Sequence, residues 1–245
     1  MSFETSSWAV GRFGDRADFV RQQLVTSLLE AMGNAQDAQR WSRSDKRFPY
    51  GQTMMTRRYE ALVEGFRNEP GFQMVKPYGS PHHLVVLDGN LLLPFRYAED
   101  DTTPITEARI TDGRISALAR ELFTRYGPAA SYRQLTLEDE AELAEVRPTL
   151  AGLPDDTRLI PVAYAGNAQA GLLRLYWGEA ELIDEFGRLR WHHYEPIPLL
   201  AAHTATLLPA QPGTATRFDH GAVPDLGLSP RESQRTAVAG GDERP

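Results

Sequence analysis

The 245-residue sequence has no cysteine, and only two of its 26 cationic residues, Lys46 and Lys76, are lysines. The lack of cysteine excludes disulfides, thiolate metal ligands and cysteine nucleophiles, and it is consistent with a reducing compartment. The preference for arginine is typical of GC-rich bacterial coding sequences, so a single arginine is weak support for phosphate binding. No stretch approaches the roughly 18 apolar residues of a membrane span, and the N-terminal residues lack a signal-peptide pattern. We therefore expect a bacterial, cytoplasmic protein with no membrane contact.

Common catalytic motifs are also missing. The sequence contains no Walker-type phosphate loop, no dinucleotide-binding glycine pattern and no Gly-x-Ser-x-Gly nucleophile elbow. Two adjacent histidine pairs, His82-His83 and His192-His193, lack the spacing of known metal motifs, so they are expected to be polar strand ends and no metal ligand is assigned. No reaction is named by any of these patterns.

Positive charge is concentrated in one short segment of an otherwise acidic chain. The formal net charge is −7, yet residues 40–58, RWSRSDKRFPYGQTMMTRR, carry six cations against one anion, Asp45. The rest of the chain therefore has a formal charge of −12. Aromatic side chains interleave with these cations, a combination that suits stacking on bases or sugars while arginines contact phosphates.

The candidate binding residues of this segment are Trp41, Arg43, Lys46, Arg47, Tyr50, Arg57 and Arg58. They predict contact with nucleic acid or with an acidic protein partner. The alternative is internal pairing, in which Arg57 and Arg58 meet Glu60 or Asp45, or the segment docks on an acidic helix at 138–145. A net charge of −7 repels a nucleic-acid duplex at long range, which favours this alternative.

Four helices are predicted from apolar residues at helical spacing and from capping residues. They occupy residues 17–32, residues 52–67, a segment from Asp112 to Tyr126, and an acidic segment from Thr136 to Pro148. Gly33-Asn34 is expected to end the first helix, because glycine and asparagine are common just beyond a helix end. Segment 40–58 should then span a loop and the first turn of the second helix.

Strands are predicted in two groups. The Asp88-Gly89 dipeptide suits a tight hairpin turn between HHLVVL and LLLPFRY, and four more strands are expected between residues 157 and 197. The pattern gives an α+β fold with about four helices covering one side of one or two mainly antiparallel sheets. The hairpin strands are continuous apolar runs, so both faces should be buried, by later strands or by a second copy in a homodimer.

Residues 1–208 are expected to form a single α+β domain, with a sub-boundary near 147–157 as the alternative. Residues 209–245 contain five prolines and five glycines but few large apolar residues, which predicts a disordered tail. The tail is also the basis of a third hypothesis, in which the protein is a structural or assembly component with a flexible arm.

A metal-dependent nuclease is the alternative enzyme hypothesis. The order helix, strand, hairpin, helix over residues 52–125 is that of a restriction-type nuclease core, which needs carboxylates at strand ends to hold a divalent ion. Asp88, Glu99 and Asp101 are the candidate catalytic ligands, and Mg²⁺ would be the cofactor. The strand after Asp88 lacks the expected Glu-x-Lys, so the preferred hypothesis is a binding or regulatory protein, of a kind found among regulatory and phage-defence genes.

Overall fold

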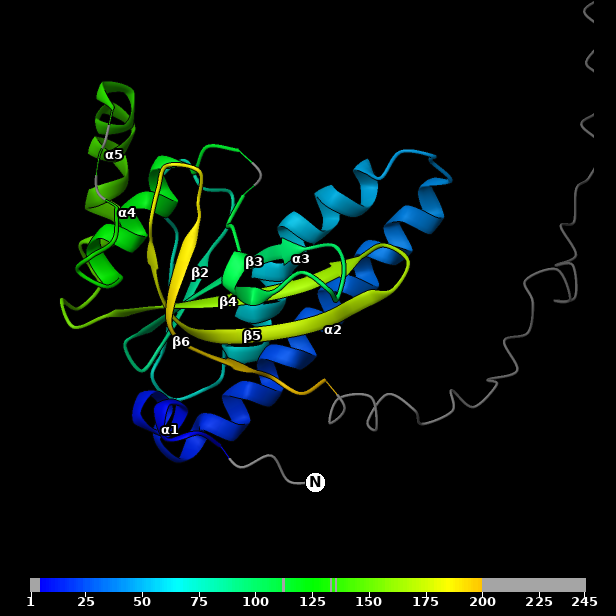
Figure 1. Ribbon diagram of the computed structural model, residues 1–245, viewed down its shortest axis with the longest axis horizontal. Helices are drawn as coiled ribbons and strands as arrows, with labels where there is room; N and C mark the ends of the chain where they lie inside the picture. The colour runs from blue at the N-terminus through cyan, green and yellow to red at the C-terminus, as the bar shows by residue number, and fades with distance from the viewer. Residues whose placement is uncertain (1–4, 112, 133, 135, 200–245) are drawn as a thin grey trace, which may run out of the picture. The chain divides into compact units, whose positions relative to one another are not determined.

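Six strands form one sheet whose spatial order follows the sequence, β1 to β6 (Figure 1). In this computed structural model the described residues are 5–111, 113–132, 134 and 136–199, and all of them belong to one compact unit. The strands are β1 (Phe72–Val75), β2 (Leu84–Leu87), β3 (Asn90–Ala98), β4 (Arg158–Asn167), β5 (Gly171–Leu182) and β6 (Leu189–Pro196). Four of the neighbouring pairs are antiparallel and one, β3 with β4, is parallel, so the predicted α+β class is confirmed.

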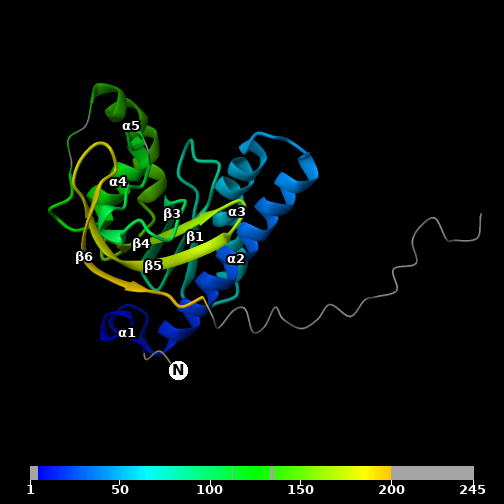
Figure 2. The same ribbon diagram turned by 45° about the vertical axis from the view of Figure 1, so that its right-hand side comes forward.

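Helices cover both faces of the sheet, and the prediction that they cover one side is wrong (Figure 2). The helices are α1 (Ser7–Phe13), α2 (Ala17–Ser42), α3 (Phe48–Phe66), α4 (Ala117–Tyr126) and α5 (Leu137–Leu150), with short 3-10 turns η1 (Gly14–Arg16) and η2 (Ile105–Glu107). The first three helices share a core with one face of the sheet. Helices α4 and α5 share a second core with the other face.

The apolar hairpin β2–β3 lies between these two cores. Val85 and Leu87 pack on the side of α2 and α3, whereas Leu84 and Val86 pack on the side of α4 and α5. Because successive strand residues point to opposite faces, a continuous apolar run supplies apolar side chains to both cores. Helices of the same chain thus cover the second face, whereas later strands or a second copy of the chain had been predicted.

The parallel pair β3–β4 depends on the connection through α4 and α5. These two helices return the chain from the end of β3 to the level at which β3 begins. Strand β4 therefore starts beside the start of β3, with Asn90 opposite Arg158. The 147–157 link lies within this connection, inside the compact unit.

Helix α2 extends about three turns beyond its predicted end, to Ser42. Gly33 and Asn34 do not stop it, because Met32 and Ala35 on either side of them are fully buried against the core. Tertiary packing overrides the local stop signal here. Segment 40–58 therefore begins in the last turn of α2.

Strand β5 is one continuous strand where two were predicted, with a break at Trp177-Gly178. A Cβ on Gly178 would lie 2.1 Å from the carbonyl oxygen of His193 on β6. The glycine thus permits close approach of two strands and is not a turn residue. Three strands, β4 to β6, follow the helices instead of four.

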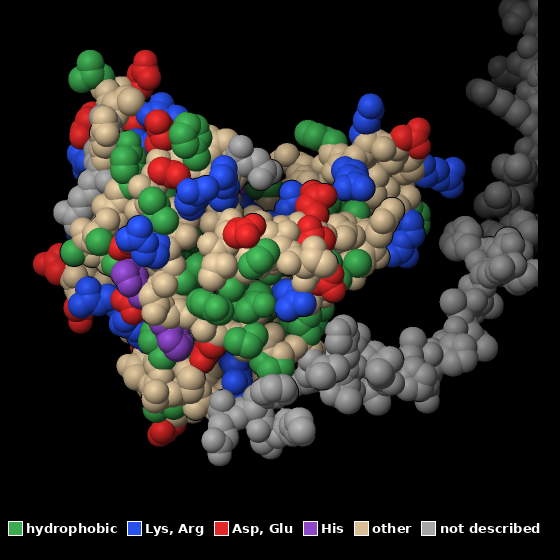
Figure 3. All heavy atoms as spheres, viewed as in Figure 1, with side chains coloured by type: hydrophobic (Ala, Val, Ile, Leu, Met, Phe, Trp, Pro, Cys, Tyr) green, Lys and Arg blue, Asp and Glu red, His purple; other side chains and the backbone are tan. Residues whose placement is uncertain are grey.

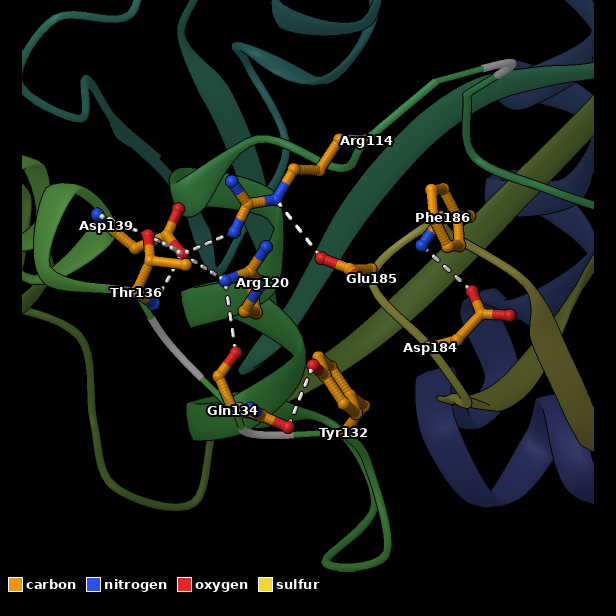
Figure 4. A network of polar contacts seen from close by, with 9 residues as sticks. All are labelled: Arg114, Arg120, Tyr132, Gln134, Thr136, Asp139, Asp184, Glu185 and Phe186. Atoms are coloured by element: carbon orange, nitrogen blue, oxygen red, sulfur yellow. Dashed lines mark hydrogen bonds and ion pairs between the residues drawn. The ribbon is translucent and has the colours of Figure 1, made fainter.

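A buried ion pair joins α4 to the start of α5 (Figure 4). Arg120 is fully buried, and its Nη1 lies 2.5 Å from Oδ2 of Asp139. Thr136 begins α5 as predicted, because its side chain and that of Asp139 form a reciprocal capping box. Helix α4 is capped by Ser116, whereas the predicted cap, Asp112, lies outside the described residues.

The predicted disordered tail, residues 209–245, also lies outside the described residues. Within the part of the chain that is described, every helix is too short or too polar to cross a bilayer.

Candidate nucleic-acid interface

The centre of the basic segment forms the turn between two long helices. Residues 41–48, here called the α2–α3 tip, comprise the end of α2, a five-residue loop and the first residue of α3. Figures 1 and 2 show this tip at the far end of the helical pair, away from α4 and α5. Lys and Arg side chains gather around it in the space-filling view (Figure 3).

Two large aromatic side chains are exposed on this tip. Trp41 is 85% exposed and Phe48 is 74% exposed. Large apolar side chains this exposed are unusual, and aromatic ones are enriched where proteins contact partners. They lie at the two ends of the loop, so both are free to stack on a ligand.

The loop cations are nearly free of internal partners. Arg43 and Lys46 make no side-chain hydrogen bond or ion pair with any described residue. Arg47 pairs with Glu99 at 3.2 Å, but both side chains are more than half exposed, so the pair contributes little stability. These cations are available to an anionic partner at small cost.

Arg43 also holds an unusual backbone conformation. It caps α2 in the left-handed region with φ 49°, where glycine is the usual residue. A side chain in this conformation costs about 1 kcal/mol. The chain therefore keeps an arginine at a position where glycine would be more stable.

Gln39 fixes the shape of the loop. Its Nε2 donates to the carbonyl oxygens of Ser44 and Lys46 at 2.8 and 3.0 Å, and its Oε1 accepts from the backbone nitrogen of Tyr50 at 3.2 Å. The loop is thus pre-organised. Sequence reasoning did not single out Gln39, since a glutamine within a helix carries no local signal for this role.

Tyr50 anchors the start of α3 to α2. It is buried, and its hydroxyl donates to the Met32 sulfur. Burial raises the pKa of Tyr50 to about 12, with smaller contributions from neighbouring charges. The ring is enclosed, so it cannot stack on a ligand.

Arg57 is the centre of an ion-pair network that joins α2 to α3. Its guanidinium lies 2.9 Å from Glu30 of α2, and 3.0 and 3.1 Å from Glu60 and Glu64 of α3. The hydrogen bond to Glu64 raises the pKa of Arg57 and lowers the pKa of Glu64. The Arg57–Glu60 pair is the internal pairing that the sequence offered as the alternative to binding a partner.

Arg58 points toward the sheet. Its guanidinium lies 5.0 Å from the ring centre of Tyr59, and Nη1 is 3.5 Å from the Tyr164 hydroxyl of β4. The Tyr59 ring also stacks on His82, with 4.7 Å between ring centres. Burial and the Arg58 charge lower the pKa of His82, so this imidazole is neutral at pH 7.

The candidate nuclease ligands are not brought together. Asp88 lies in the turn before β3, whereas Glu99 and Asp101 follow the end of this strand. Nine residues of extended chain separate the two ends by on the order of 30 Å. A single metal ion cannot reach both.

Two of these three carboxylates form ion pairs with arginines. Asp88 forms an ion pair with Arg16, and Glu99 pairs with Arg47 and with Arg96, the latter at 3.0 Å. Positive φ angles at Asp88 and Gly89, 49° and 74°, confirm the predicted tight turn. No group of three His, Asp or Glu side chains among the described residues could hold a metal ion.

The structure thus divides the predicted binding residues into two sets. Trp41, Arg43, Lys46 and Arg47 are exposed on the α2–α3 tip, whereas Tyr50, Arg57 and Arg58 make internal contacts. Comparison with protein-family models, curated proteins and solved structures finds no match to this chain.

Proposed function

We propose that this protein works by binding, and that its α2–α3 tip contacts single-stranded nucleic acid. The observation that carries the proposal is the exposure of Trp41 and Phe48, at 85% and 74%, around a loop with unpaired cations. Base stacking on aromatic side chains combined with cationic contacts to the backbone is the usual mode of single-strand binding. Trp41 and Phe48 stack on bases, and Arg43, Lys46 and Arg47 contact phosphates.

The charge distribution supports a single strand over a duplex. The tip is a small positive surface on a chain of net charge −7. A chain of this net charge repels a rigid duplex at long range, whereas a flexible strand contacts the tip alone. Gln39 holds the loop in place before binding, which lowers the entropy cost of association.

Fluorescence anisotropy with labelled single-stranded and double-stranded oligonucleotides tests this proposal. The double variant Trp41→Ala with Phe48→Ala should lose binding, since each stacked base contributes about 1–3 kcal/mol. Its matched control is Tyr78→Ala with Phe186→Ala, which removes two other exposed rings, 59% and 52% exposed. Equal binding by the two double variants would refute the proposal.

An acidic protein is the alternative partner. A labelled polyglutamate peptide in the same titration separates the two cases, because it offers negative charge without bases to stack on. Binding of the peptide without binding of the oligonucleotide would assign the tip to an acidic protein.

A further inference from the structure

The turn between β5 and β6 lies far from the α2–α3 tip (Figures 1 and 2). A second cationic site lies at this turn. A pocket of about 650 Å³ is lined there by residues of η2, the turn and β6. Three arginines, Arg109, Arg188 and Arg190, line it together with Trp191. This volume lies within the usual range for small-molecule sites.

The strand pairing forces two of these arginines together. Arg109 and Arg188 are opposite each other in an isolated antiparallel bridge. The bridge is flanked by hydrogen bonds from Ile110 N to Gly187 O, 2.9 Å, and from Leu189 N to Ala108 O, 3.2 Å. This makes it a non-hydrogen-bonded pair, the arrangement in which facing side chains come closest, with Cβ atoms about 4.5–5.5 Å apart.

Like charges directly opposite each other destabilise a strand pair. A nearby carboxylate would relieve the repulsion, but neither Arg109 nor Arg188 forms a side-chain ion pair or hydrogen bond with any described residue. Arg190, two residues further along and on the same face, differs because buried Glu181 neutralises it at 2.7 Å. Two unpaired positive charges therefore remain.

The acidic residues of the adjacent turn are committed elsewhere (Figure 4). Asp184 accepts hydrogen bonds from the backbone nitrogens of Phe186 and Arg188 at 2.9 and 3.1 Å. Glu185 pairs with Arg114 at 3.4 Å, and Arg114 reaches Asp139 at 3.1 Å. The turn is thus held in a shape in which neither acidic side chain forms an ion pair with Arg109 or Arg188.

Glu107 is the only carboxylate among the residues that line the pocket, and it makes no ion pair with a described arginine. The remaining lining includes the apolar residues Ile183, Leu189 and Trp191, of which Leu189 is only 2% exposed. Trp191 is fixed, because its indole nitrogen donates to Ile105 O at 3.0 Å. The pocket therefore combines two unpaired arginines with the partly exposed apolar residues Ile183 and Trp191.

We propose that this pocket binds a small phosphate monoester with an apolar or aromatic body, held by Arg109 and Arg188. A phosphate dianion neutralises both guanidinium groups, and their planar forks match its oxygens. A monocarboxylate neutralises only one. The site is separate from the α2–α3 tip and does not depend on the function proposed for it.

Titration of the full chain with phenyl phosphate, followed by NMR and calorimetry, tests this assignment. Backbone amides of 106–109 and 187–191 should shift with saturation, and benzoate should bind more weakly. Arg109→Gln with Arg188→Gln should raise the dissociation constant at least tenfold, whereas Arg125→Gln with Arg158→Gln, which removes two other exposed arginines, should leave it unchanged.

A melting temperature shows whether the arginines serve structure instead. Because Arg109→Gln with Arg188→Gln removes a repulsion, the ligand-free variant should melt at or about 1–3 °C above the parent. Absence of saturable phenyl phosphate binding at millimolar concentration would overturn the proposal. So would equal binding by parent and variant, or amide shifts located at the α2–α3 tip.

Discussion

Asp139→Asn should destabilise the protein severely, because it leaves Arg120 charged and buried. Arg120 has no exposed surface, and its Nη1 lies 2.5 Å from Asp139 Oδ2. Arg114 and Thr136 donate to the same oxygen, at 3.1 and 2.8 Å. The asparagine keeps the size and one acceptor of the aspartate, so the variant chiefly tests the charge.

The pKa of Asp139 and the cost of an unpaired buried charge both indicate how much free energy of unfolding Asp139→Asn loses. Burial alone would raise the pKa of Asp139, but the bonds from Thr136 and Arg120 lower it from 3.8 to about 2, a difference worth about 2 kcal/mol. Removing one partner of a buried pair typically costs about 3–5 kcal/mol, since the other charge stays buried. We expect a loss of about 3 kcal/mol, and a melting temperature lower by about 6–12 °C.

Urea unfolding followed by circular dichroism measures this loss, with Glu138→Gln as the control. Glu138 lies in the same first turn of α5 but is exposed, so its variant should match the parent within about 0.5 kcal/mol. The Asp139 carboxylate has a folded pKa below its unfolded value, so its contribution is present above pH 3.8 and is lost toward pH 2. The parent and Asp139→Asn should therefore converge in stability as the pH falls through this window. A loss below about 1 kcal/mol at pH 7 would refute the reasoning.

Further predictions concern the helical pair and the sheet. Arg57→Gln should lower the free energy of unfolding by about 1 kcal/mol in urea titrations, whereas Arg40→Gln, which removes one exposed ion pair, should change it by less than about 0.5 kcal/mol. The Arg57→Gln effect should shrink in acid, since the lowered pKa of Glu64 means that its carboxylate loses charge, and the pairing with Arg57, only as the pH falls through that pKa. Gly178→Ala should cost about 1–3 kcal/mol, because the added methyl group meets a carbonyl of β6 at 2.1 Å. Gly33→Ala, in open space within α2, should instead stabilise by up to about 1 kcal/mol in the same assay, and the opposite order of these two glycine variants would contradict the packing described.

Local signals in the sequence predicted much of the fold. The Asp88-Gly89 turn, the start of α5 at Thr136 and the end of α4 at Tyr126 all depend on a few neighbouring residues, and all three are found. Such features are readable because their causes lie within one turn of chain.

Features caused by distant contacts were not predictable. Gly33 and Gly178 each look like the end of an element in the sequence. Helix α2 and strand β5 nevertheless continue past them, because other elements pack against these segments. The second helical layer was missed for the same reason, since periodicity shows that a strand is buried on both faces but not by what.

The candidate site shows the same limit. Composition located the cationic segment and offered Glu60 as an internal partner of Arg57, but it could not show that Arg57 also pairs with Glu30 on α2 or that Arg58 reaches Tyr164 on β4. The pairing of Arg109 with Arg188 joins residues that are far apart in the sequence, so only the strand register reveals it.

The salt dependence of single-stranded oligonucleotide binding tests the central claim most directly. Contacts from Arg43, Lys46 and Arg47 to three phosphates predict a slope of about −2 for the logarithm of the association constant against that of the salt concentration. Arg43→Gln with Lys46→Gln should reduce this slope to about −0.7, while Arg125→Gln with Arg158→Gln should leave it at about −2. An unchanged slope in the first variant, or no binding by the parent at low salt, would contradict the assignment of the α2–α3 tip as a nucleic-acid contact.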